Sequence, residues 1–170
     1  MKTLRLLLGD QLNSEHSWFD EVNPNVMYVM AEMRQETDYV KHHIQKVVAF
    51  FLSMRNFSNE LIKQGHQIVY YKISDANNPQ YLETLILDLV EKNNIECFEY
   101  QFPDEYRLDE QLKSLSEKLS IPTKAVDSEH FYTSRNELAD FFKGKKQLLM
   151  ESFYRMMRKK HHILMIGDQP

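Results

Sequence analysis

Residues 26–31 read VMYVMA, six apolar residues in a row that end at Glu32. Uninterrupted apolar runs of this kind are typical of strands that are buried on both faces, as in a parallel sheet. Four further segments have the length and the β-favouring composition of strands: 3-TLRLLL-8, 67-QIVYYKI-73, 95-IECFEY-100 and 123-TKAV-126. The sequence therefore predicts five strands.

Segments with helical periodicity separate these strands. Between residues 38 and 65, apolar residues recur three and four positions apart, which predicts a long amphipathic helix that ends at Gly65. Asn78-Pro79 is expected to open a second helix, with Pro79 at its first position. Three more helices are predicted over 105–119, 134–142 and 150–161, and the one at 134 begins with the capping box 134-SRNE-137.

Alternating strands and helices predict an α/β fold. We expect a Rossmann-like, mostly parallel five-stranded sheet with helices on both faces. The chain has only four glycines and contains neither G-x-G-x-x-G nor a Walker A sequence. The glycine-rich phosphate cradles of dinucleotide-binding and P-loop proteins are therefore absent.

Cysteine content and charge limit the classes of function. The single cysteine, Cys97, excludes an intrachain disulfide and an iron–sulfur cluster held by this chain alone. The apolar run 6-LLL-8 is too short for a signal peptide or a membrane span, so a cytoplasmic protein is expected. A net charge of −4 disfavours the chain as the main contact surface for duplex DNA.

One basic segment departs from this acidic balance. Residues 143–160 contain one acid, Glu151, and seven basic residues: Lys143, Lys145, Lys146, Arg155, Arg158, Lys159 and Lys160. Such a run is either a solvated helix face or a surface for docking or phosphate binding.

Polar residues follow the first two predicted strands. The segment 9-GDQL-12 supplies Asp10 and Gln11, and 31-AEMRQETDY-39 supplies Glu32 and Glu36. In open α/β sheets, ligands bind beyond the carboxyl ends of the strands. These side chains can bind the polar edge of a heterocycle and the hydroxyls of a ribityl or ribose chain. A plain turn at Asp10 and a solvated loop at the two glutamates are the alternatives.

The start of the predicted long helix offers further candidates. His42 and His43 have no acid or histidine at positions 46 and 47, so a helical metal site is not supported, and a histidine packed against a loop is preferred. Phe50 and Phe51 are adjacent and point in different directions. One of them can line a pocket while the other packs in the core, although both can belong to the core.

Three segments resemble a known family. The LGDQL sequence at 8–12, 39-YVKHHIQKVVAFFLSMRNF-57, and 150-MESFYRMMRKKHHILM-165 with the following GDQP are similar to photolyase-related proteins. They resemble more closely the iron–sulfur bacterial cryptochromes and (6-4) photolyases, from Leu4 to Pro170. The resemblance implies an N-terminal α/β domain that holds an antenna chromophore, 6,7-dimethyl-8-ribityllumazine. A larger helical domain with FAD, a [4Fe–4S] cluster and a DNA-lesion pocket would follow it.

The resemblance also implies positions for the cofactor-binding residues. Gly9 and Asp10 would lie beside the antenna, and Glu32 and Glu36 would lie on the loop where a glutamate holds the lumazine. Phe50 would lie beside the ring, although it is bulkier than the aliphatic residue expected there. The remaining predicted site residues, from the same loops and the helix start, are Gln11, Tyr39 and His43.

These implications give a domain plan. We expect residues 1–145 to form the antenna domain and 146–170 to form a connecting helix and linker toward a helical FAD domain outside this chain. The chain would then be the non-catalytic antenna part of a flavoprotein for light-driven DNA repair or blue-light sensing. Damaged DNA would bind through the helical domain, no membrane would be involved, and the apolar residues of 161–170 predict weak self-association. A stand-alone module that binds lumazine, flavin or nucleotide remains an alternative, as does a light-sensing regulator.

Overall fold

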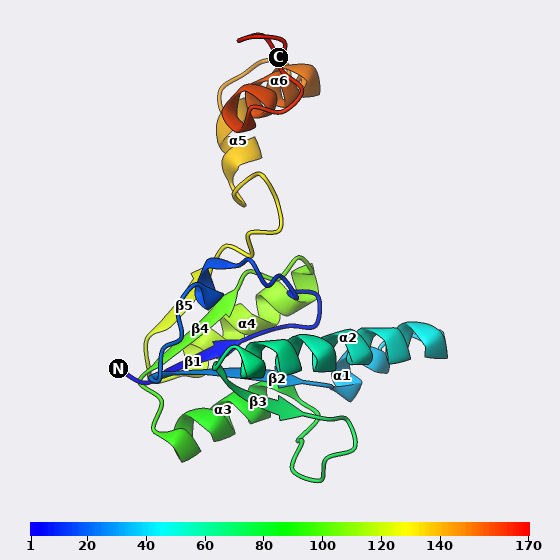
Figure 1. Ribbon diagram of the computed structural model, residues 1–170, viewed down its shortest axis with the longest axis vertical. Helices are drawn as coiled ribbons and strands as arrows, with labels where there is room; N and C mark the ends of the chain where they lie inside the picture. Colours follow the sequence, from blue (N-terminus) through cyan, green and yellow to red (C-terminus); the bar gives the residue numbers. More distant parts are fainter. The chain divides into compact units, whose positions relative to one another are not determined.

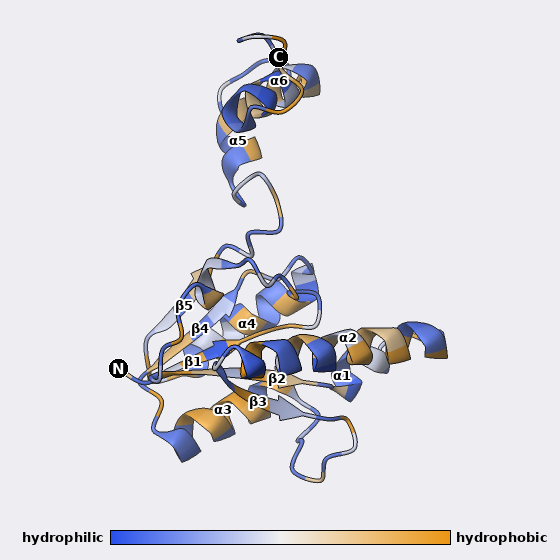
Figure 2. Ribbon diagram, viewed as in Figure 1, coloured by the Kyte–Doolittle hydropathy of each residue, from blue (hydrophilic) through white to orange (hydrophobic).

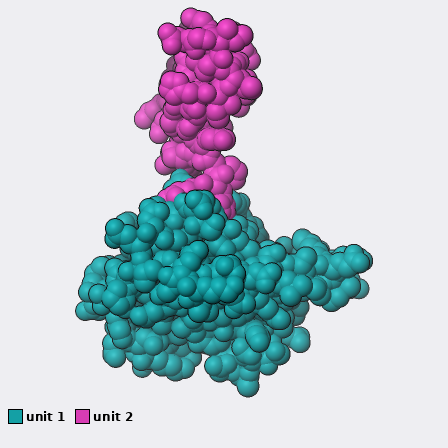
Figure 3. All heavy atoms as spheres, viewed as in Figure 1, with its two compact units in different colours: residues 1–128 teal, residues 129–170 magenta.

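The computed structural model describes residues 1–170 and divides into two compact units. Unit 1 is residues 1–128 and unit 2 is residues 129–170 (Figure 3). The division expected from the sequence, an antenna domain over 1–145 and a connecting segment over 146–170, concerns function and stays a prediction. No helix of the chain is both long and apolar enough to cross a lipid bilayer.

Unit 1 is built on a five-stranded sheet in the order β3-β2-β1-β4-β5. The strands are β1 (Thr3–Leu6), β2 (Val26–Ala31), β3 (Gln67–Tyr71), β4 (Cys97–Gln101) and β5 (Thr123–Val126). Every neighbouring pair is parallel, and Thr3 on the central strand is in register with Val26 on one side and Cys97 on the other. The predicted α/β, Rossmann-like fold is confirmed, and the sheet is parallel throughout.

Helices cover both faces of this sheet (Figure 1). The long helix α2 (Ile44–Lys63) and the short 3-10 helix η1 (Ser17–Phe19) pack on one face, and α3 (Leu82–Asn93) and α4 (Tyr106–Lys118) pack on the other. Hydrophobic residues concentrate in α3 and along part of α2 (orange in Figure 2). Successive residues of a strand point to opposite faces, so Val29 joins the α3 and α4 core while Met30 joins the α2 core. This two-sided burial explains the uninterrupted apolar run of β2.

The predicted helix over 38–65 was wrong at its start. A four-residue helix, α1 (Arg34–Thr37), precedes a turn, and α2 begins only at Ile44. His43 has extended backbone angles, and its Nδ1 accepts a hydrogen bond from the backbone N–H of Gln45 at 3.2 Å. This N-cap satisfies a donor that a helix start leaves unpaired, and it sets the boundary.

The prediction for Asn78-Pro79 was also wrong. Pro79 lies in the loop before the helix, Gln80 has a φ of 64°, and α3 begins only at Leu82. The buried Asn78 amide donates to the backbone oxygens of Glu32 and Lys72 at 2.7 and 3.0 Å. Asn78 therefore ties the loop after β3 to the end of β2 instead of opening a helix.

Unit 2 contains α5 (Glu137–Phe142) and α6 (Met150–His161). The bounds predicted for α6 are confirmed. Helix α5 begins at Glu137 rather than Ser134, although the Glu137 carboxylate accepts the backbone N–H of Ser134, as half of the predicted capping box requires. Gly144 follows α5 with a φ of 76°, a conformation that favours glycine.

A cluster of phenylalanines joins α5 to α6. Phe153 is buried, and its ring centroid lies 5.2 Å from that of Phe141 and 6.1 Å from that of Phe142. Met150 and Tyr154 of the same helix are both at least half exposed. The core of unit 2 is too small to cover them. Two of the basic residues form ion pairs within the unit, Arg155 with Glu151 and Lys160 with Glu137.

Candidate ligand-binding site

A cavity of about 230 Å³ lies in unit 1 at the carboxyl edge of the sheet. This edge is where open α/β sheets bind their ligands. The walls come from the ends of β1 and β2, from α1 and the turn after it, and from the first turns of α2, α3 and α4. The lining residues are Leu6, Leu7, Leu8, Asp10, Ala31, Met33, Glu36, Thr37, Tyr39, His42, Lys46, Val47, Phe50, Phe51, Leu82, Glu105 and Leu108.

The lining is mainly apolar, with a few charged groups among the hydrophobic residues. Three carboxylates take part, those of Asp10, Glu36 and Glu105, together with Lys46 and His42. A mostly apolar cavity with a small number of polar groups is typical of sites for small organic ligands. No cluster of three or more His, Cys, Asp or Glu side chains in the chain is arranged to hold a metal ion.

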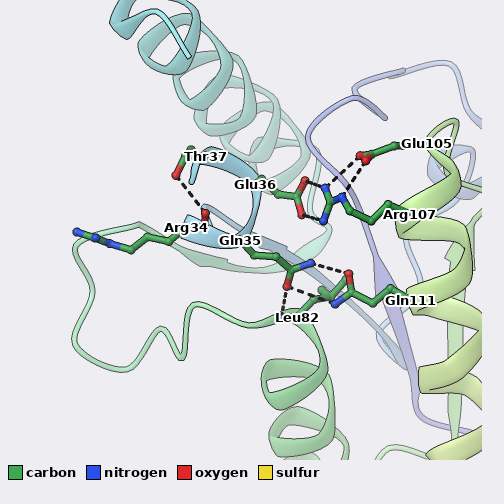
Figure 4. A network of polar contacts seen from close by, with 8 residues as sticks. All are labelled: Arg34, Gln35, Glu36, Thr37, Leu82, Glu105, Arg107 and Gln111. Carbon is green, nitrogen blue, oxygen red and sulfur yellow. Dashed lines mark hydrogen bonds and ion pairs between the residues drawn. The ribbon is translucent and has the colours of Figure 1, made fainter. Parts of the chain in front are cut away.

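Arg107 of α4 holds the carboxylate of Glu36 in place (Figure 4). Its Nη2 lies 2.7 Å from Glu36 Oε2, and its Nε lies 2.8 Å from Glu105 Oε1. The guanidinium carbon also lies 4.8 Å from the centroid of the Tyr39 ring. The hydrogen bond to Glu36 raises the pKa of Arg107 most, and the hydrogen bond to Glu105 raises it further, whereas burial lowers it. The cavity is thus bordered by a charged cluster from α1, from the turn after it and from the start of α4.

Phe50 fills the space beside the loop after β1. A Cβ atom at Gly9 would collide with the Phe50 ring and would lie 2.9 Å from Met54 Sδ. Glycine at position 9 therefore lets the ring pack directly on the backbone. Phe50 remains partly exposed and lines the cavity, whereas Phe51 is buried in the α2 core while also lining it.

Gln11 follows the same loop but points into the protein. Its Oε1 accepts the backbone N–H of Leu8 at 3.0 Å, and its Nε2 donates to the backbone oxygen of Gln101 at 3.2 Å. Gln11 thereby links the loop after β1 to the end of β4. It is buried and does not line the cavity, so its contacts are those of a structural residue.

Glu32 and His43 also make contacts away from the cavity. Glu32 is fully buried, and its carboxylate accepts hydrogen bonds from Arg55, Tyr70 and the backbone of Ile73. His43 caps α2. Of the eight predicted cofactor-binding residues, the structure brings four together as cavity lining: Asp10, Glu36, Tyr39 and Phe50. The role of each in binding stays a prediction.

The wall contributed by α3 and α4 was missed at the sequence level. Leu82, Glu105 and Leu108 line the cavity, and Arg107 anchors it. A signal was available, because 105-EYR-107 follows closely on the carboxyl end of β4, the strand beside β1. The rule that ligands bind beyond the carboxyl ends of the strands applies to this loop as well.

Comparisons with known proteins decide the family. Residues 5–170 match the family described as deoxyribodipyrimidine photo-lyase-related protein. The chain belongs to this family. It is 31% identical over 171 residues to a (6-4) photolyase of Agrobacterium fabrum (strain C58), an alignment that covers all of this chain and 34% of that relative. It is 22% identical over 179 residues to the uncharacterized protein R852 of Acanthamoeba polyphaga mimivirus, covering 88% of it.

The family resemblance inferred from the sequence is therefore confirmed. The chain spans about a third of the length of the (6-4) photolyase that it matches. It spans most of the length of the mimivirus relative.

Proposed function

We propose that unit 1 binds 6,7-dimethyl-8-ribityllumazine, or a closely related small heterocycle, as the antenna chromophore of a photolyase-related flavoprotein. The observation that carries this proposal is the cavity at the carboxyl edge of β1 and β2, with its apolar walls and three carboxylates. A flat bicyclic ring suits the apolar walls, and a hydroxylated side chain suits the carboxylates. Phe50 lines the cavity, and its ring takes up space that a third ring of a flavin would need, which supports a two-ring ligand.

The cavity residues have distinct roles in this proposal. Glu36, fixed by Arg107, accepts hydrogen bonds from ring or ribityl donors, and Lys46 donates to ring acceptors. Tyr39 and Phe50 contact the ring and keep water from it. A lumazine held by these residues would supply light absorption and the transfer of excitation energy to a flavin. These residues of the chain bind and orient the ring, and they carry out no bond-making step.

The light-driven chemistry itself is proposed for a helical domain outside residues 1–170, where FAD and a [4Fe–4S] cluster would be held. The proposal draws on the (6-4) photolyase relative, of which this chain matches 34%. Cys97 is buried in β4, which suits a packing role rather than a cluster ligand. We expect DNA with (6-4) lesions to keep those lesions when it is illuminated with residues 1–170 and FAD. Measurable repair would contradict this division of labour.

The mimivirus relative favours a second candidate function. This chain covers 88% of that protein, so a relative of similar size exists. Such a module would bind a lumazine, a flavin or a nucleotide and would perform no catalysis alone. The reading frame beyond residue 170 separates the two candidates, since several hundred further residues of helical pattern with cysteines support the antenna proposal.

Titration with 6,7-dimethyl-8-ribityllumazine tests the binding function. Wild-type protein should bind it at one site, and Glu36→Ala should lower the affinity by about tenfold or more, because a hydrogen bond to a charged group contributes about 1.5–3 kcal/mol. Glu117→Ala is the matched control, since Glu117 is exposed on α4 and does not line the cavity. Wild-type protein that binds no lumazine contradicts the proposal. Unchanged affinity of folded Glu36→Ala removes Glu36 from the site.

A further inference from the structure

Helix α1 forms one wall of the cavity although its own packing is slight. It has four residues, none of which is buried. A helix of one turn has little intrinsic stability in water, so contacts with other elements must fix it. The backbone N–H of Arg34 donates to Gln80 Oε1 at 3.0 Å, and two sets of side-chain contacts also hold α1 (Figure 4). Gln35 pairs with Gln111 of α4 and accepts the backbone N–H of Leu82, while Glu36 pairs with Arg107.

Arg107 connects three groups that border the cavity. Its Nη1 and Nη2 lie 3.5 and 2.7 Å from the two oxygens of Glu36, and its Nε and Nη2 lie 2.8 and 3.1 Å from the two oxygens of Glu105. The planar guanidinium suits such a double fork, which an ammonium group cannot reproduce. Its stacking distance to Tyr39 adds a cation–π contact. Glu36, Glu105 and Tyr39 all line the cavity, whereas Arg107 does not.

We propose that Arg107 is a positioning residue of the ligand site: it fixes Glu36, Glu105 and Tyr39 and so sets ligand affinity without touching the ligand. The inference rests on the proposed binding function of the cavity. Without Arg107, two carboxylates would face the same space and repel each other. Helix α1 would then move, since none of its own residues is buried, and Glu36 would leave the orientation that a ligand needs.

The exposure of the cluster separates positioning from stability. The side chains of Arg107, Glu36 and Glu105 are 37%, 32% and 43% exposed. Ion pairs with this much solvent contact contribute little to folding. Loss of Arg107 should therefore weaken ligand binding while leaving unfolding nearly unchanged. Loss of a purely structural residue would instead lower the free energy of unfolding and leave the ligand affinity of the folded protein unchanged.

Lumazine binding, the absorption band of the bound lumazine and urea unfolding should be measured for wild type, Arg107→Ala and Arg107→Lys. We expect Arg107→Ala to weaken binding by about tenfold and to shift the band, and Arg107→Lys to restore only part of the affinity. Gln111→Ala is the matched control, because it frees no cavity carboxylate and leaves α1 held by the hydrogen bond from the Leu82 backbone N–H to Gln35 and by the Glu36–Arg107 pair. Its affinity should stay within about twofold of wild type.

A double-mutant cycle with Glu36→Gln tests whether Arg107 acts through Glu36. Coupled residues give a double variant whose loss of affinity is smaller than the product of the two single losses. The inference is overturned if the affinity losses of the two single variants simply multiply in the double variant. It is also overturned if folded Arg107→Ala keeps the affinity and the absorption band of wild type. In both cases the binding function stands. Wild-type protein that binds no lumazine overturns the binding function and, with it, this inference.

Discussion

Arg55 of α2 donates two hydrogen bonds to the fully buried carboxylate of Glu32, from Nε to Oε1 at 2.6 Å and from Nη2 to Oε2 at 2.9 Å. The Tyr70 hydroxyl and the backbone N–H of Ile73 donate to the same carboxylate at 2.8 and 2.9 Å. A buried charge is tolerated only when it is paired and hydrogen-bonded. Because Glu32 follows β2 directly, this pair fixes α2 against the sheet beside the cavity.

Replacing Arg55 should therefore destabilise the fold. Arg55→Met leaves the Glu32 carboxylate buried without its counter-charge, a change that costs about 3–5 kcal/mol for a fully buried pair. Because Arg55 is 39% exposed, we expect a loss of free energy of unfolding near the lower end of that range. Urea unfolding measures it, with Lys63→Met as control, since the Lys63–Glu60 pair is exposed on the same helix. Equal stability of the two variants would show that water reaches the Glu32 carboxylate and solvates its charge when Arg55 is absent.

The same pair should make the free energy of unfolding depend on pH in the acid range. Burial raises the pKa of Glu32, but hydrogen bonds from Arg55, the Ile73 backbone and Tyr70 outweigh burial and hold the pKa below its usual 4.5. The stabilisation is therefore complete above the unfolded pKa and is lost as pH falls through the folded pKa. We expect Glu32→Gln to be less stable at neutral pH and to lose less stability on acidification. Parallel curves of unfolding free energy against pH for the two proteins would contradict this origin.

The close packing of Phe50 on Gly9 should make position 9 intolerant of a side chain. Gly9→Ala forces the Phe50 ring and the buried Met54 to move, and overpacking of this kind costs about 1–3 kcal/mol. Urea unfolding measures the loss of stability. Phe50→Leu in the Gly9→Ala background should recover part of it, because the smaller side chain frees the space. Absence of any recovery would place the strain in the backbone at position 9.

Phe50 should also limit the size of the ligand. Phe50→Leu removes ring atoms from the cavity wall, so a three-ring flavin should gain affinity relative to the two-ring lumazine. Fluorescence titration with riboflavin and with 6,7-dimethyl-8-ribityllumazine measures the ratio of the two affinities. Phe57→Leu is the control, since Phe57 packs against the α2 core and does not line the cavity. If Phe50→Leu leaves the ratio unchanged, another residue sets the size limit.

The regular part of the fold could be predicted because its causes are local. The apolar run of β2 and the helical spacing of α6 identified both elements from the sequence, since burial on two faces and on one face leave different patterns. The starts of α2 and α3 were missed because single side chains set them. His43 caps one helix, and Asn78 holds the turn before the other through long-range hydrogen bonds.

The candidate site could be predicted only in part, for a related reason. Asp10 and Glu36 were found because they follow strands, and the carboxyl ends of parallel strands meet at one edge. Glu32 follows a strand as well, yet its carboxylate belongs to a buried network with α2. Glu36 and Arg107 are 71 positions apart in the chain, so no local sequence pattern predicts their pairing.

Unit 2 should mediate weak self-association through its last residues. Leu164 and Ile166 are 69% and 86% exposed, and Ile163 is 37% exposed. Covering such side chains gains about 1.5–3 kcal/mol for each one fully buried. Sedimentation of the purified chain should therefore show a weak, concentration-dependent dimer that is lost on truncation after Lys160. Replacing Leu164 and Ile166 by serine should abolish it without removing backbone, whereas Val22→Ser, at an exposed apolar position of unit 1, should not. A chain that stays monomeric at every concentration would contradict this prediction. It would show that these side chains pack within their own molecule or stay exposed to solvent without driving association.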